Sequence, residues 1–379
     1  MTGAIAATVL NGIHSALLSA GNGSMGGGMG GGGMGGGGMG GSGDSPLSMN
    51  GPMWMPDKPY TLLGLFAYHP QPIPIFPVLG LVLAALYIAG VVVLHRRGDR
   101  WPIGRTIWWM LGVATLELMT VTALDGYGMD FFSVHMFQHM VMGMLTPILL
   151  MLGAPITLLL RSLPATGGKR SPRRLLLLFL HSRFAAVVAN PVVTVLLFLF
   201  SLYALYFTPL FDWLMSTWWG HNLMLLHFLA IGCLYFWGIL GVDPSPRRGG
   251  GLMGTFSRPV VRIAELSATV PFHAFFGIVF MMATTVIVKY YSTTLPWASS
   301  TPLSDQQTAG GIAWGFTELP TLLLLGVLFL QWQRSDARAA QRQARRVERF
   351  GDVDLDAYNA SLAALAKQDE ALSRPDSAR

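Results

Sequence analysis

The sequence predicts an all-α, polytopic membrane protein, a bundle of seven transmembrane helices with its N-terminus outside and its C-terminus inside. Of the 379 residues, 52% are hydrophobic and only 12% are charged, whereas about a quarter of the residues of a soluble domain are charged. The apolar residues also fall in blocks of about twenty, the length that crosses the roughly 30 Å hydrocarbon core as a helix. These two observations disfavour an ordinary water-soluble enzyme.

The predicted spans follow from the hydropathy pattern. They cover residues 76–94, 103–124, 131–153, 186–208, 221–241, 260–288 and 309–331. The apolar run 175–180 is too short to cross, and we expect it at the membrane interface. Lys and Arg gather in the connections that follow the first, third, fifth and seventh spans, and the other connections hold almost none. Because cytoplasmic loops carry the excess of cations, this alternation sets the orientation.

The chain divides into four regions. Residues 1–20 are apolar but lack the cationic start of a signal peptide, so whether they span the membrane or are cleaved stays open. Residues 21–59 form an extracytoplasmic Met/Gly-rich segment with sixteen Gly between positions 21 and 43, a composition typical of a flexible tether. The seven-helix domain covers residues 60–332, and residues 333–379 form a basic cytoplasmic tail that we expect to begin as a surface helix.

Cysteine content and charge exclude several kinds of site. The single cysteine, Cys233, lies inside an apolar block, which excludes a disulfide framework, a CxxC redox centre and a thiolate metal cage. The net charge of +6 does not indicate nucleic acid, because the basic residues lie in short loops between apolar blocks. We therefore expect membrane lipid to surround the helices.

Ionisable side chains inside the spans are the candidate functional residues, because the membrane makes each one costly by a few kcal/mol or more. They are Glu117, His135, His139, His221, His227, Glu265, His273 and Glu318. His135 and His139 are four residues apart, so they share a helix face with about 5–6 Å between their Cβ atoms and can hold one metal ion. Met142 continues this face.

Imidazole and thioether ligands without a thiolate suit copper, especially Cu(I). We therefore predict a copper site in the outer half of the membrane. Its candidate residues are His135, His139, His227, His273, Glu318, Glu117 and Met142, with the two glutamates as ligands or as charge-balancing partners. Low-affinity collection of copper would fall to Met25, Met29, Met34, Met39, Met49, Met53 and Met55.

Two of the costly residues have simpler explanations. His221 lies at the predicted interface, where a histidine costs little, and we expect it to be structural. Glu265 is three residues from Arg262, so an ion pair within one helix is expected.

The stretch from His135 to Pro147, continuing to Pro155, resembles the signature of the CtaG family of cytochrome c oxidase assembly factors. Three further segments agree with that family, namely 227–244, 271–277 and 305–320. The resemblance covers about residues 60–332. It implies a role in maturing the copper centres of haem-copper oxidases in the bacterial plasma membrane. It also implies functional positions at His135, His139, His227, His273 and Glu318.

We therefore expect an assembly factor that binds copper on the outer side and assists its delivery to the oxidase. Its partners would be cytochrome c oxidase subunits, with an extracytoplasmic copper chaperone as a further candidate. No nucleophile–base–acid set appears among the outer-side residues, so we do not expect an enzyme. Three alternatives stay open: a haem-binding redox protein with His135 or His139 and His227 as axial ligands, a copper transporter that uses Glu265 and Thr269, and a metal-free assembly scaffold.

Overall fold

The computed structural model describes residues 51–164, 171–247, 258–350 and 353–373. These residues contain no β-strand, apart from an isolated bridge between Tyr68 and Thr122, so the predicted all-α class is confirmed. The predicted segment 1–20 lies outside the described residues. So do most of the predicted tether and Met25, Met29, Met34, Met39 and Met49.

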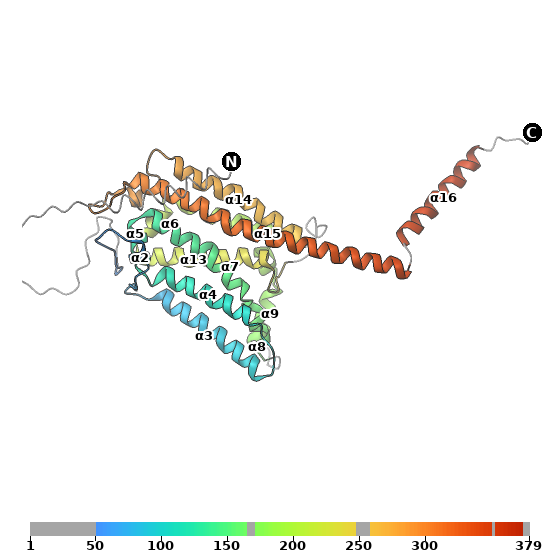
Figure 1. Ribbon diagram of the computed structural model, residues 1–379, viewed down its shortest axis with the longest axis horizontal. Coiled ribbons are helices and arrows are strands. Elements are labelled where there is room, and N and C mark those ends of the chain that lie inside the picture. The colour runs from blue at the N-terminus through green and yellow to red at the C-terminus, as the bar shows by residue number, and fades with distance from the viewer. Residues whose placement is uncertain (1–50, 165–170, 248–257, 351–352, 374–379) are drawn as a thin grey trace, which may run out of the picture. The chain divides into compact units, whose positions relative to one another are not determined.

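Helices account for most of the described chain (Figure 1). In chain order they are α2 (Leu62–Leu65), α3 (Ile75–Arg96), α4 (Ile103–Thr120), α5 (Ala123–Asp130), α6 (Phe132–Met140), the π-helical turn η1 (Val141–Leu145), α7 (Thr146–Leu152), α8 (Pro155–Ser162), α9 (Pro172–Leu180), α10 (Arg183–Val188), α11 (Pro191–Tyr206), α12 (Leu210–Met215), α13 (Trp218–Leu240), α14 (Arg258–Met282), the 3-10 turn η3 (Lys289–Ser292), α15 (Pro302–Phe350) and α16 (Val353–Ser373).

Five helical segments among the described residues are long and apolar enough to cross a membrane. They are Ile75–Arg96, Phe132–Ser162, Trp218–Leu240, Pro259–Met282 and Pro302–Arg349. The other two predicted spans correspond to α4, which carries Arg105 and Glu117, and to α11, which has 16 residues. Length and composition thus support five of the predicted spans directly.

Two predicted boundaries differ from the structure. The span predicted at 103–124 ends at Thr120, because Thr122 is extended and begins the separate short helix α5. The overlong span predicted at 260–288 ends at Met282. The short helices α5 and η3, which follow α4 and α14, both lie near the start of α6. They are joined there by a hydrogen bond from the Tyr291 hydroxyl of η3 to the Gly128 carbonyl of α5.

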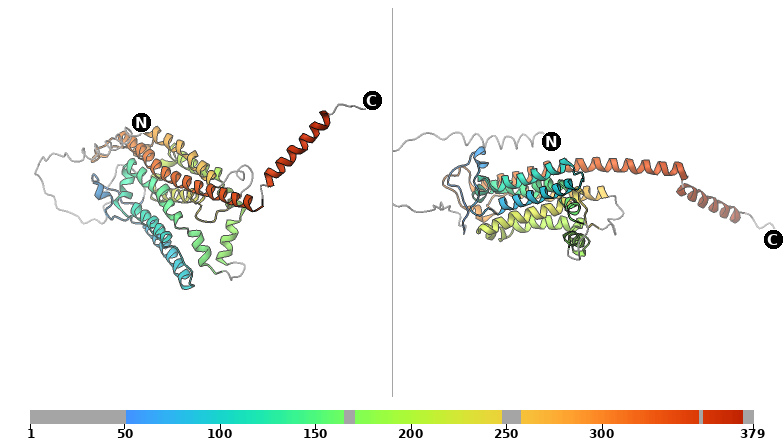
Figure 2. Two further views of the ribbon diagram at one scale, coloured as in Figure 1. Left: turned by 45° about the vertical axis from the view of Figure 1, so that its right-hand side comes forward. Right: turned by 90° about the horizontal axis from the view of Figure 1, so that it is seen from below.

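The segment α6–η1–α7 is the centre of the first compact unit, which ends at Leu325. Helices α3, α4 and α7 lie side by side in Figure 1, and α13 packs on α7 and η1. Helix α11 packs against both α13 and α14, and Figure 2 shows the bundle from two further sides. Every residue of α6 except Phe137 is buried. The other side chains on α6 therefore face protein, whatever surrounds the bundle.

Pro147 explains the π-helical turn. Proline has no backbone N–H, so the carbonyl of Gly143, four residues earlier, loses its α-helical partner and the helix widens at this point. Helix α13 approaches the widened turn at Gly232, where a Cβ atom would overlap the Gly143 carbonyl oxygen. Glycine at position 232 is therefore what lets these two backbones touch, and the contact seats Phe228 beside His139.

The second compact unit runs from Gly326 to Arg379 and contains the rest of α15 and α16. The predicted tail, from residue 333, was expected to begin as a helix, and α15 extends to Phe350. Leu355, Tyr358, Leu362 and Leu365 are exposed on α16.

Candidate metal centre

Three histidines meet in the buried centre of the first unit. His135 and His139 come from α6, and His221 comes from the first turn of α13; their exposed fractions are 0%, 1% and 0%. The ring centres of His135 and His139 are 5.4 Å apart, and those of His135 and His221 are 5.6 Å apart. We call these three residues the histidine cluster.

The ring nitrogens of the histidine cluster have no hydrogen-bond partner. Both nitrogens of each ring are buried and unpaired. A buried polar group without a partner costs about 1–3 kcal/mol, so a cluster of such groups in a packed core is expensive. A bound group that accepted these nitrogen lone pairs would remove that cost, so the donor set fits a metal ion.

Aromatic side chains enclose the histidine cluster. Phe211 and Tyr291 lie 5.3 and 6.1 Å from His135 between ring centres. The ring centre of Tyr206, at the end of α11, lies 5.6 Å from that of His139. The Tyr206 hydroxyl is buried and has no hydrogen-bond partner. This wall separates the imidazoles from their surroundings and lowers the local dielectric.

A small cavity of about 20 Å³ lies next to the histidine cluster. It has room for one water molecule or one ion. Its lining is His139, Met140, Gly143, Met144, Phe198, Leu202, Phe228 and His273. His273 comes from α14, is buried, and has its Nδ1 unpaired. His139 and His273, both predicted as site residues, therefore line the same cavity.

Three other predicted site residues lie elsewhere. His227 is exposed and shares a hydrogen bond of 2.6 Å with the Ser201 hydroxyl. Glu318 is also exposed and accepts a hydrogen bond from Trp314 of its own helix. Glu117 lies between α3 and α4, where its carboxylate occupies the space that a side chain on Gly80 would need. The structure does not bring these three to the histidine cluster.

Met142 was predicted to continue the face of His135 and His139, and it does not line the cavity. It is fully buried in the hydrophobic core. The π-helical turn begins directly after Met140 and adds a residue to the turn, so a four-residue spacing no longer keeps one face. Met140 and Met144 line the cavity instead.

Within the described ranges, no group of three or more His, Cys, Asp or Glu side chains is arranged to hold a metal ion. The rings of His135 and His139 are stacked, with 19° between their planes. Stacked rings present their nitrogens side by side. At most two imidazoles, with or without methionine sulphur, are therefore available at any one point.

Comparison with known proteins shows the family of the chain. A family model for the cytochrome c oxidase caa3 assembly factor, Caa3_CtaG, matches residues 85–335. The chain belongs to this family.

The CtaG family match contains the whole histidine cluster and His273. Uncharacterized proteins of Mycobacterium bovis and Mycobacterium tuberculosis are 45% identical to the chain over 293 residues, 76% of this chain and 43% of theirs. One of Mycobacterium leprae is 42% identical over 292 residues. The chain thus spans less than half the length of these relatives. No solved structure matches it.

Sequence reasoning left His221 of this Caa3_CtaG chain out of the candidate metal site. It was expected at the membrane interface in a structural role, and the structure shows it fully buried against His135 in the first turn of α13. The periodicity of α13 contained the signal: His221, Leu225, Phe228 and Gly232 follow one another at intervals of four, three and four, and all are buried. His227 lies off this stripe.

The only predicted tether residues among the described ones are 51–59, and they pack on the bundle. Trp54 stacks on His69 with 3.6 Å between ring centres, and the backbone N–H of Trp54 donates to the side-chain carbonyl of Gln71. Met53 and Met55 are half-buried beside it. This end of the segment is therefore anchored, and His69 has a packing role.

Two buried carboxylates hydrogen-bond to α6: Asp305 of α15 through Ser133, and Asp125 of α5 through Gln138. The Gln138 amide donates to Asp125 Oδ1 at 2.6 Å and to the Met119 carbonyl at 2.8 Å. Burial raises the pKa of Asp125 to about 7, although hydrogen bonds from Gln138 and Gln71 act in the opposite direction. Gln138 thus joins α6 to α4 and α5 instead of facing the histidines.

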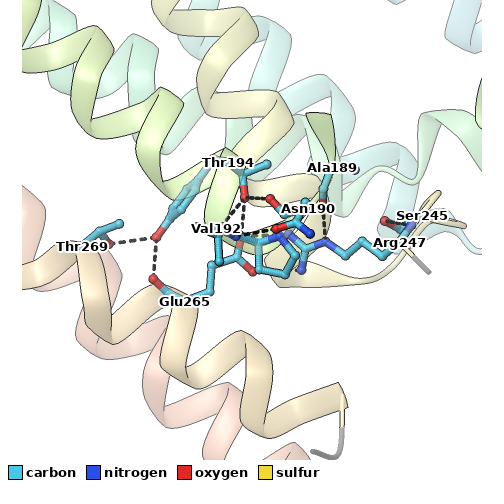
Figure 3. A network of polar contacts seen from close by, with 10 residues as sticks. Ala189, Asn190, Val192, Thr194, Ser245, Arg247, Glu265 and Thr269 are labelled. Atoms are coloured by element: carbon cyan, nitrogen blue, oxygen red, sulfur yellow. Dashed lines mark hydrogen bonds and ion pairs between the residues drawn. The ribbon is translucent and has the colours of Figure 1, made fainter. Parts of the chain in front are cut away.

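A further buried carboxylate of the CtaG bundle, Glu265 on α14, was expected to pair with Arg262 and forms an ion pair with Arg247. Figure 3 shows the Arg247 guanidinium reaching both Glu265 carboxylate oxygens, at 2.8 Å each. Thr194 donates to the same carboxylate, and Arg247 Nε donates to the Ala189 carbonyl. Thr269 shares a hydrogen bond with Tyr235. These polar groups are already satisfied within the fold.

Proposed function

We propose that the protein is a cytochrome c oxidase assembly factor that binds Cu(I) in the histidine cluster and assists its delivery to an oxidase copper centre. The observation that carries the proposal is a set of three fully buried histidines whose ring nitrogens have no partner. Imidazole with neighbouring thioether and no thiolate suits Cu(I). Membership of the caa3 assembly-factor family supports an oxidase as the partner.

We further propose that seven helices cross the bacterial plasma membrane, with the N-terminus outside. Contacts between helix ends support this count. His135 on the first turn of α6 touches His221 on the first turn of α13, so both helices start at the same end of the bundle. The chain must return between them, and α11 is the helix available for that. Likewise Glu117, near the end of α4, meets Gly80, near the start of α3.

With that orientation the histidine cluster lies in the outer half of the bundle, about 6–12 Å below the surface at which α6 begins. The Met-rich segment 21–59 lies on the same side and would collect Cu(I) with low affinity. Subunits of cytochrome c oxidase and an extracytoplasmic copper chaperone are the proposed partners. In this role the protein acts as a carrier of the ion and not as an enzyme.

The alternatives find less support in the geometry. The cavity beside His139 holds about 20 Å³, whereas a cofactor of haem size needs several hundred. A copper path through the inner half would use Glu265 and Thr269, which are bound to Arg247 and Tyr235. A metal-free scaffold would gain stability from apolar residues in place of unpartnered histidines.

The test is Cu(I) binding to the detergent-purified chain under reducing conditions, with a chromophoric chelator as competitor. We expect His135→Ala combined with His139→Ala to lower the affinity of tight binding at least 100-fold. The matched controls are His227→Ala and Glu318→Gln, which alter exposed positions away from the cluster and should bind as wild type does. Unchanged tight binding by the double variant would contradict the site.

A further inference from the structure

We propose that the buried centre holds two successive Cu(I) stations. The outer station is the imidazole pair His135 and His221, and the inner station is the cavity bounded by His139, His273, Met140 and Met144. This inference rests on the proposed function, since it describes how the same centre handles its ion. It assigns a ligand role to His221, Met140 and Met144.

The outer station has the spacing of a shared ion. Two imidazoles that bind one ion at about 2.1 Å, with an angle of about 110–120° between them, have ring centres about 5.4–5.6 Å apart. His135 and His221 are 5.6 Å apart between ring centres, with their planes tilted by 48°. Both rings are fully buried with both nitrogens unpaired. No other polar side chain competes for them by a hydrogen bond.

The inner station has the volume and the donor atoms for one soft ion. The cavity of about 20 Å³ is lined by two imidazoles and two thioethers. His139 has both ring nitrogens unpaired, and His273 has Nδ1 unpaired. The hydroxyl of Thr317 lies 3.9 Å from the Met140 sulphur, a weak contact that keeps this side chain in place. Nitrogen with sulphur favours Cu(I) over Zn(II) and Ca(II).

Two stations also agree with the absence, within the residues the structure describes, of any group of three metal-binding His, Cys, Asp or Glu side chains. Each station has two imidazoles, and only the inner one adds sulphur. A single site made of all the histidines would bring three or four of them to one point.

His135 and His139 connect the stations. Their rings are stacked 5.4 Å apart, one helical turn from each other. The ion would move by ligand exchange, in which a His139–Cu bond forms as the His221–Cu bond breaks. Copper stays Cu(I) throughout, so no oxidant, reductant or proton is required. The thioethers of the inner station bind Cu(I) more strongly than imidazoles alone, which gives the movement its direction.

The experiment is an anaerobic Cu(I) titration of the full chain in detergent, with bound copper counted after chelator competition. We expect two equivalents for wild type and one for His221→Ala. We also expect one for Met140→Leu combined with Met144→Leu, a change that keeps the volume nearly constant. His227→Ala, on the same helix as His221 but exposed, should keep two equivalents.

Each outcome has a distinct meaning. Two equivalents in His221→Ala, or one in wild type, would overturn the two stations and leave the proposed function standing. No copper in wild type would overturn the proposed function itself. If a variant fails to fold, X-ray absorption of wild type decides the matter. With one equivalent of copper, we expect scattering from sulphur ligands. With two equivalents, we expect a smaller average sulphur contribution, because the second copper has nitrogen ligands only. No sulphur contribution at either equivalent would contradict the inner station.

Discussion

His221 and His227 show how one helix separates two identical side chains. They are six residues apart on α13, which places them about 240° apart around the helix axis. His221 therefore meets the histidine cluster, while His227 faces outward and is held by Ser201. Any membrane helix with one buried stripe would separate them in this way, and the separation makes them a natural pair of test and control positions.

Asp125 gives a pH-dependence at the residue scale. It is neutral in the folded protein below its raised pKa of about 7, but in the unfolded chain it ionises above about pH 4. Between these values the folded state holds one more proton. The contribution of Asp125 to the free energy of unfolding should therefore fall as the pH rises from about 4 to 7, then level off. The thermal midpoint of wild type minus that of Asp125→Asn, both in detergent, should drop by a few degrees between pH 5 and 8.

The control for this prediction is the exposed carboxylate Asp57. Asp125→Asn should remove the Asp125 contribution to the dependence of the midpoint on pH, since the amide can still accept the Gln138 hydrogen bond and does not titrate. Asp57→Asn should leave the slope as in wild type. An equal slope in the Asp125 variant and wild type would show that Asp125 does not titrate in this window.

At the scale of elements, the π-helical turn determines which methionine side chains line the cavity beside His139. Pro147 widens the helix at Gly143, and Gly232 lets α13 close onto it. The result turns Met144 toward the cavity and Met142 into the core. One proline and two glycines on two helices thus set the chemistry of the inner lining.

Gly232→Ala tests this contact. The added methyl would overlap the Gly143 carbonyl and the Pro147 ring, so α13 must move away from η1. We expect a loss of about 1–3 kcal/mol in stability, measured as a lower thermal midpoint, together with weaker Cu(I) binding because the cavity changes shape.

The matched control is Gly311→Ala on α15, where the added methyl has open space. It should preserve both stability and Cu(I) binding, and the better helix propensity of alanine acts in its favour. Equal effects of the two substitutions would mean that the close approach at Gly232 has no energetic role.

At the scale of the whole bundle, the connection after α13 fastens distant helices together. Asp243 accepts hydrogen bonds from the backbone N–H groups of Ile156 and Thr157 at the start of α8. Four residues later, Arg247 pairs with Glu265 on α14. A single loop therefore ties α8 to α14 at the end of the bundle opposite the histidine cluster.

Arg247→Ala should be strongly destabilising, because it leaves the buried Glu265 carboxylate, 1% exposed, without its counter-charge. Breaking such a pair costs about 3–5 kcal/mol, visible as a large fall in the thermal midpoint. Arg247→Met combined with Glu265→Leu should recover most of the loss, since it removes both charges.

Arg161→Ala is the comparison. Arg161 pairs with Asp99 at 3.6 Å, but both side chains are exposed, and such pairs contribute about 0–1 kcal/mol. A similar loss of stability for Arg161→Ala and Arg247→Ala would contradict the fastening role of the buried pair.

Hydropathy and charge in the sequence determined the fold class, the approximate positions of the helices, and the membrane-costly residues from which a site must be chosen. Local spacing was sufficient for His135 and His139, because one α-helix carries both. The resemblance to the CtaG family, drawn from four segments, was confirmed by the family match over residues 85–335.

Only the tertiary structure decided which of those residues meet. It placed His221 beside His135, left His227 and Glu318 exposed, and paired Glu265 with Arg247. Sequence spacing cannot predict these outcomes, because they depend on how each helix is rotated about its axis and on a π-helical turn that shifts the register by one residue. Such rotations are fixed by contacts between helices distant in the chain, such as Gly232 against Gly143.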